Sequence, residues 1–213
     1  MARNLENIVD LYRYILRKER GAFITLPEVT ANLDAGQLDA LEGYFKLYGI
    51  NQEVHDALRP FRVYYQFTTD SGGFVTYPSG YLHILGTAFT VSGSTVNEIT
   101  FPNEDEWVSA INSQLRPIGL QSPIARDTNT GFSILPQTTQ IGFFTYIRRP
   151  NTPVYATTQN GRAISFDAGN SVELEWSDVY INNIIAKGLR YAGVNMNEQG
   201  ISQFAEMYNK ETQ

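Results

Sequence analysis

Glu173 and Glu175 are the residues of this sequence whose types and spacing come closest to catalytic chemistry. In an extended segment both would project from one face, with Asp178 nearby, as the paired carboxylates of a glycosidase do. The structural alternative is a strand whose acids meet solvent, with Asp178 in the first turn of a helix and an inward face made of Val172, Leu174 and Trp176. We favour this alternative, and the glycosidase hypothesis stays open.

Other catalytic or cofactor chemistry has little support in the residues. The two histidines, His55 and His83, lie on different predicted elements and lack the spacing of metal ligands. Cysteine is absent, which excludes thiol catalysis and thiolate metal sites. Neither a phosphate-binding glycine loop nor a nucleophile elbow occurs. The sequence therefore predicts no bound metal or cofactor and no enzymatic activity.

Basic residues are densest at two points. Arg148 and Arg149 precede Pro150, and a second group, Arg17, Lys18 and Arg20, ends the first predicted helix. Either group suits a phosphate contact. The favoured interpretation is that they complement a helix C-terminus or pair with carboxylates on a neighbouring molecule.

Hydrophobic periodicity predicts helices at both ends of the chain. Residues 4–20 form an amphipathic helix with Asn4 as its cap and Gly21 after its end, and a second helix begins near Asp34. Asn51 caps a short helix that ends at Pro60. Residues 177–193 and 197–210 form the last two helices.

The middle of the chain has the alternating pattern of strands. The first stretches, 61–67, 74–77, 81–91 and 96–101, are separated by short turns and predict a meander. A capping box at 103–106 opens a short helix that ends before Pro117. Further strands are expected at 123–126, 131–135, 139–148, 153–157 and 162–166. We therefore expect an α+β fold with its terminal helices packed together around a central antiparallel insertion, a sandwich or barrel. Residues 1–60 and 174–213 would form the helical domain and 61–173 the β-rich domain, with its helix near 103–115.

Composition narrows the possible partners. Acidic residues number 22 against 16 basic ones in a chain of 213, giving a formal net charge of -6. This balance disfavours general binding to the phosphate backbone of DNA. Tyrosine and phenylalanine number 13 and 12, a supply that suits sheet faces and protein interfaces. No signal-like or membrane-spanning apolar run occurs, so we expect a soluble chain with no membrane partner.

Six stretches carry a resemblance to a known family: His55–Phe61, Tyr77–His83, Phe101–Trp107, Leu115–Pro117, Gly142–Tyr155 and Leu174–Ile185. They resemble virion structural proteins of tailed phages of Bacteroidetes, including the crAss-like podoviruses, and in particular a head-to-tail adaptor, gatekeeper or tail ring protein. The similarity runs across most of the chain. None of the stretches is a catalytic signature.

The resemblance implies a non-enzymatic subunit of a closed ring, commonly twelvefold, in the virion neck or tail, assembled in the host cytoplasm. Its partners would be copies of itself, the portal, and neighbouring ring and tail proteins, with genomic DNA passing through the lumen without specific binding. On this hypothesis the residues expected at subunit interfaces are Arg17, Arg20, Arg148, Arg149, Glu173 and Glu175.

Two alternatives remain. The first is a peripheral virion protein that binds or hydrolyses glycans through its aromatic sheet and the Glu173–Glu175 pair. The second is a tail assembly factor or chaperone that is missing from the finished particle. A glycosidase must hold its two carboxylates in one cleft, whereas a ring protein must self-assemble.

Overall fold

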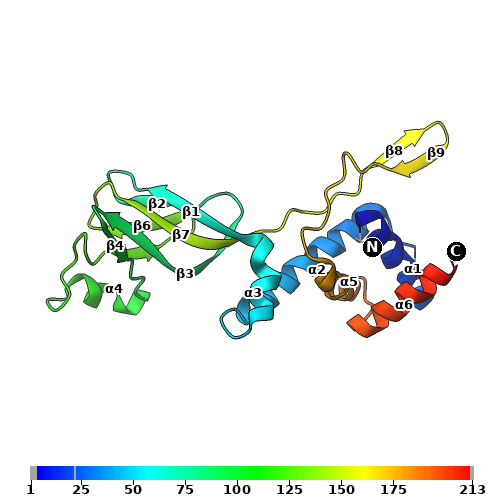
Figure 1. The fold of residues 1–213 in the computed structure, drawn as a ribbon, viewed down its shortest axis with the longest axis horizontal. Helices are drawn as coiled ribbons and strands as arrows, with labels where there is room; N and C mark the ends of the chain where they lie inside the picture. Colours follow the sequence, from blue (N-terminus) through cyan, green and yellow to red (C-terminus); the bar gives the residue numbers. More distant parts are fainter. Residues whose placement is uncertain (1–3, 22, 212–213) are drawn as a thin grey trace. The chain divides into compact units, whose positions relative to one another are not determined.

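The computed structural model describes residues 4–21 and 23–211 and divides the chain into two compact units. A helical unit contains Met1–Pro60 and Pro150–Gln213, and a β-rich unit contains Phe61–Arg149 (Figure 1). The fold is α+β, with helices from both ends of the chain packed together and antiparallel sheets between them in sequence. This architecture confirms the predicted fold class.

The first helix, α1 (Leu5–Arg20), has the ends that the sequence predicts. The Asn4 side chain accepts a hydrogen bond from the Asn7 backbone N–H at 3.0 Å, which caps the N-terminus. At the other end Gly21 adopts a left-handed conformation with φ 61° and donates its N–H to the Arg17 carbonyl. Both caps are local, so their residues specify the helix boundaries directly.

The second helix, α2 (Leu26–Lys46), starts earlier than predicted, so the expected start near Asp34 is wrong. A capping box at Thr25 sets the true start: the Glu28 carboxylate accepts hydrogen bonds from the Thr25 backbone N–H at 2.9 Å and from its hydroxyl at 2.7 Å. Pro27 fits the first turn, where no intrahelical N–H donor is needed. The short helix α3 (Gln52–Leu58) follows, capped by Asn51 as expected, and then one 3₁₀ turn (Arg59–Phe61).

Packing of α2 against α5 (Asp178–Tyr191) joins the two ends of the chain. Two glycines allow the close approach: a Cβ on Gly36 would lie 2.7 Å from the Gly188 backbone nitrogen and 2.8 Å from the Ile184 carbonyl oxygen. Tyr12 of α1 is fully buried beside this contact and donates its hydroxyl to the Gly188 carbonyl at 2.9 Å. The last helix, α6 (Glu198–Glu211), packs against α5 and α1.

The β-rich unit contains two antiparallel sheets with a shared core. One sheet has the order β1-β7-β3-β4, formed by Arg62–Thr68, Ile141–Arg148, Tyr81–Ser92 and Thr95–Glu98. The other has the order β2-β6-β5, formed by Phe74–Thr76, Gly131–Leu135 and Ile124–Asp127. The core draws residues from both sheets, and its aromatic centre is made of Phe67, Phe132, Phe144 and Tyr146.

The strand pairing corrects the predicted meander. β1 pairs with β7 (Arg62↔Ile147) and β2 pairs with β6 (Phe74↔Ser133), so these neighbours in sequence belong to different sheets. Only β3 and β4 form the expected sequential hairpin in this stretch. The turn at 70–73 redirects the chain from one sheet to the other, because each strand buries its inner face against a partner much later in the sequence.

Two other local expectations also fail. α4 (Glu104–Ile111) is shorter than the predicted helix, and its N-cap residue Asn103 makes no side-chain capping bond. Glu104 instead binds the Arg126 guanidinium with oxygen to nitrogen distances of 3.2 and 2.8 Å. The expected strand around Glu173 and Glu175 is an extended segment whose backbone forms one isolated bridge, Val154↔Val172.

Residues 150–173, placed with the β-rich domain by the sequence pattern, cluster with the helical unit. The buried Gln37 side chain of α2 donates to the Asn151 carbonyl at 2.9 Å, which ties this segment to the helices. The segment also contains the hairpin of β8 (Thr157–Asn160) and β9 (Ala163–Phe166), whose strands pair only with each other (Figure 1).

Candidate functional site

The carboxylates of Glu173 and Glu175 bind two different backbone segments. Glu173 Oε2 accepts a hydrogen bond from the Leu5 N–H at 2.5 Å, at the first residue of α1. Glu175 Oε2 accepts one from the Asn151 N–H at 2.8 Å. A carboxylate at a helix N-terminus satisfies a free N–H and interacts favourably with the helix dipole. Both contacts are structural, and they favour the structural interpretation of the pair.

Arg20 acts at the end of another helix. Its guanidinium donates to the carbonyls of Ala192 and Gly193 at 3.0 and 2.7 Å, just after the last residue of α5. Cationic donors suit these carbonyls, which have no partner within the helix. Arg17 is exposed, one turn earlier on α1. The helix C-terminal role anticipated for basic residues therefore applies to Arg20.

Arg148 and Arg149, in the β-rich unit, differ in exposure. Arg148 is half-buried, with its guanidinium carbon 5.8 Å from the centre of the Phe61 ring. Arg149 has an exposed side chain, and its backbone N–H donates to the Gly80 carbonyl at 2.7 Å. Arg148 thus packs against an aromatic ring, whereas the side chain of Arg149 is exposed.

The two histidines lie in different units. His55 on α3 packs its ring against Tyr48, with ring centres 4.3 Å apart, and His83 is half-buried on β3. Within residues 4–21 and 23–211, no cluster of three or more histidine, cysteine or acidic side chains is arranged to hold a metal ion. In the same ranges no helix has the length and apolar character needed to span a membrane.

Tyr77 and Tyr81 form a perturbed aromatic pair in the β-rich unit. Their rings stack with centres 3.8 Å apart, and the Tyr77 hydroxyl donates to Asp127 at 2.5 Å. Burial, followed by the Asp127 hydrogen bond, raises the pKa of Tyr77 above its ordinary value. Because a raised pKa makes the phenol a weaker acid, this arrangement anchors the stacked pair and does not activate a proton donor.

Sequence reasoning missed the exposure of the β8–β9 hairpin. Its eight strand residues are all exposed except Phe166, which packs its ring against Tyr155 with centres 4.8 Å apart. In Figure 1 the hairpin extends away from the helices of its unit. An isolated two-stranded hairpin is marginally stable in water, so a surface that covers this element would stabilise it.

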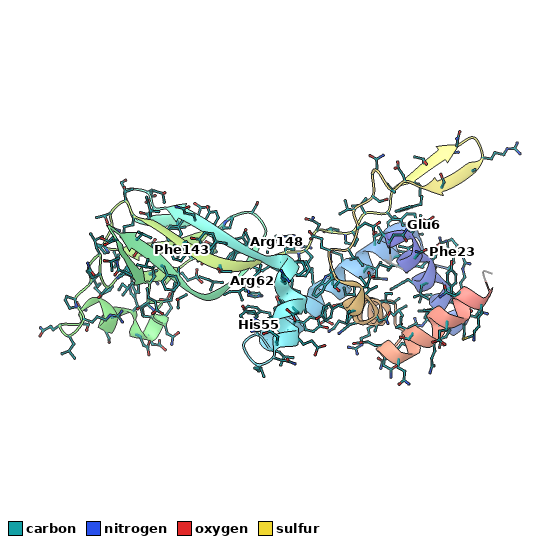
Figure 2. The ribbon with its side chains drawn as sticks, in the orientation of Figure 1. Glu6, Phe23, His55, Arg62, Phe143 and Arg148 are labelled. Atoms are coloured by element: carbon teal, nitrogen blue, oxygen red, sulfur yellow. The ribbon has the colours of Figure 1, made fainter. Side chains whose placement is uncertain are left out.

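The outer face of the four-stranded sheet is a second feature that sequence reasoning did not identify. Phe143 lies on it (Figure 2), with its ring centre 5.5 Å from Tyr64 of β1 and 5.3 Å from Phe89 of β3. These rings border a cavity of about 310 Å³. Apolar side chains extend the surface toward β4, with exposed fractions of 50% for Ile141, 37% for Val91 and 54% for Val96. We call these six residues the aromatic face.

Exposed apolar side chains also line α4 and the loop that follows it. The helix has no buried residue, and Val108 and Ile111 are 65% and 39% exposed. Leu115 in the loop is fully exposed. In the helical unit, a cavity of about 390 Å³ lies beside the exposed ring of Phe23 and is bordered by Ile24 and Tyr191. The described surface thus carries several apolar patches suited to protein contacts.

Comparison with known protein families and with curated proteins gives no match to this chain.

Proposed function

We propose that this chain is a structural subunit of a tailed-phage virion that assembles with copies of itself into a ring of the head-to-tail connector or tail. In this role it joins the portal to the tail and leaves a passage for DNA. The observation that carries the proposal is the β8–β9 hairpin, an element with a single half-buried strand residue. The resemblance of the six stretches named above supplies the phage context.

Self-assembly accounts for the exposed hairpin. Folding a segment costs chain entropy, which burial must offset, and this hairpin buries little surface. A partner molecule that covers it would provide the missing burial. A ring subunit has such a partner on each side, because head-to-tail contacts use two different patches of the same chain.

The contacts of Glu173, Glu175 and Arg20 support a non-enzymatic role. Glu173 holds the start of α1, Glu175 holds the segment at Asn151, and Arg20 holds the end of α5. Through these hydrogen bonds the charged groups stabilise the helical unit. The subunit therefore acts through assembly, with no chemical step and no bound cofactor.

The net charge of -6 fits a DNA conduit. Repeating an acidic subunit around a ring disfavours tight binding of the phosphate backbone, because binding requires clustered cations that displace counterions. DNA then slides through the ring without being held.

The direct test is a cryo-electron microscopy reconstruction of the portal and tail of purified virions whose genome encodes this chain. Ring density around the DNA path that fits the helical and β-rich units is the expected result. Density only at the tail periphery would refute the ring and favour a glycan-binding part. A chain missing from purified particles would refute the proposal in favour of an assembly factor.

A further inference from the structure

We propose that the β8–β9 hairpin of one copy docks on the aromatic face of a second copy, with Ile164 entering the cavity beside Phe143. This inference rests on the proposed self-assembly and names the two surfaces that meet. One surface belongs to the helical unit and the other to the β-rich unit, so every copy carries one of each.

The hairpin carries its two large apolar side chains on one face. Residues paired across an antiparallel ladder point to the same side. The pairs Gln159↔Ile164 and Thr157↔Phe166 therefore share a face, on which Ile164 is 71% exposed. On the other face the hydroxyls of Thr158 and Ser165 are 3.1 Å apart, within hydrogen-bonding distance. Docking through the Ile164 face buries apolar surface and leaves these hydroxyls in solvent.

The aromatic face has the side-chain composition of a sheet surface that is covered by another molecule. An antiparallel sheet with one solvated face normally carries polar side chains there. Here Tyr64 remains 63% exposed, and Phe89 and Phe143 stack beside it. A β-bulge between Leu85 and Phe89 interrupts the pairing of β3 with β7, and Gly86 adopts φ 72° within it. The cavity of about 310 Å³ lies at this bulge and is large enough for an isoleucine side chain.

Charge complementarity favours a second copy as the occupant. Arg162 lies in the hairpin turn and is exposed, and Glu98 lies opposite Phe89 on β4 and is also exposed. Within the described residues, neither Arg162 nor Glu98 forms an ion pair. In the orientation that we infer, with Ile164 in the cavity beside Phe89, the hairpin turn places Arg162 next to Glu98 of β4. Such a pair fixes the orientation of docking more than its strength.

The two surfaces differ, so the contact is heterologous. Repeating a heterologous contact produces a closed ring when the rotation closes and a filament when it does not. The contact therefore matches the geometry that a ring subunit requires.

The chain lacks cysteine, so a disulfide can form only between cysteines that are introduced. Ile164→Cys and Phe143→Cys are prepared as separate proteins, mixed and mildly oxidised, so that only contacts between copies give a mixed dimer. The matched control replaces Ile164→Cys with Thr158→Cys, on the opposite face of the hairpin. We expect the mixed dimer to form at least about tenfold faster with Ile164→Cys, because a disulfide needs Cα atoms about 4.4–6.8 Å apart.

A charge exchange gives an independent test. Arg162→Glu and Glu98→Arg, each alone, should weaken self-association about two- to fivefold, and the double variant should recover the wild-type value. Sedimentation velocity of the full chain measures this association.

The outcomes separate the docking contact from the proposed function. If the wild-type chain self-associates but the Ile164→Cys and Phe143→Cys proteins form no more mixed dimer than the Thr158→Cys control, the docking contact is refuted and ring assembly stands. If the double variant Ile164→Cys/Phe143→Cys forms its disulfide only within one chain, docking between copies is also refuted. If the virion reconstruction shows no ring of this chain, the proposed function is refuted, and the disulfide results do not change that outcome.

Discussion

Replacing Gly36 by alanine should test whether α2 and α5 meet backbone to backbone. The added Cβ would lie 2.7 Å from the Gly188 nitrogen and 2.8 Å from the Ile184 oxygen, both main-chain atoms that yield only if the helices separate. Overpacking of this kind costs about 1–3 kcal/mol. Alanine gains about 1 kcal/mol over glycine within a helix. With two backbone clashes the cost lies toward the upper end, so we expect a net loss of about 1–2 kcal/mol.

A glycine on the same helix provides the control. A Cβ on Gly43 meets only the Lys187 ammonium, at 4.0 Å, so Gly43→Ala should gain about 0.5–1 kcal/mol through helix propensity. Urea unfolding followed by far-ultraviolet circular dichroism measures both variants, because most of the helices belong to the helical unit. With a urea slope of about 1–3 kcal/mol per molar, the two midpoints should move in opposite directions. A Gly36→Ala midpoint equal to or above that of the wild type would refute the close contact.

Three further predictions concern the charged and titratable groups. Burial raises the pKa of Tyr12 from 10.0 to about 12, so its contribution to stability is complete below pH 10 and is lost as the pH rises toward 12. Thermal melts of Tyr12→Phe should therefore lose part of the alkaline decline of the wild type, and an unchanged decline would contradict this assignment. Glu173→Gln should cost about 0.5–1 kcal/mol in urea unfolding by weakening the cap of α1, whereas an unchanged midpoint would show that the cap contributes nothing. Arg149→Glu should remain folded, as measured by circular dichroism, but should block incorporation into particles, and normal particles would show that Arg149 lies outside the subunit contacts.

Elements defined by local chemistry were predictable from the sequence. The boundaries of α1 follow from Asn4 and Gly21, and the start of α3 follows from Asn51. The start of α2 was equally readable, because the Thr25 to Glu28 spacing is that of a capping box. The apolar periodicity alone predicts a later start, because this periodicity becomes clear only further into the helix.

Strand pairing was not predictable in this way. The turn at 70–73 has the composition of a hairpin turn, and its local chemistry is the same whether it joins paired strands or strands of two sheets. What separates β1 from β2 is pairing with β7 and β6, which depends on how all inner faces fill one core. The local pattern of each strand and turn does not specify that choice.

The roles of the candidate site residues were also not predictable, because their partners lie far away in the sequence. Glu173 binds Leu5 across 168 residues, and Arg20 binds Gly193 across 173. The helix C-terminal role expected for the basic group is confirmed for Arg20, whereas Glu173 was expected to face solvent and instead binds the N-terminus of α1. The particular helix that each would serve depended on the packing of the two chain ends.

The aromatic face did leave a signal in the sequence, carried by β7. Phe144 and Tyr146 of this strand point into the core, while Ile141 and Phe143 lie on the outer face. A strand within a sheet that is solvated on one side needs apolar residues on one face only. Apolar residues on both faces of β7 are typical of a strand covered on both sides, yet Ile141 remains 50% exposed. On the docking proposal, the Ile164 face of the β8–β9 hairpin of a second copy supplies this second cover.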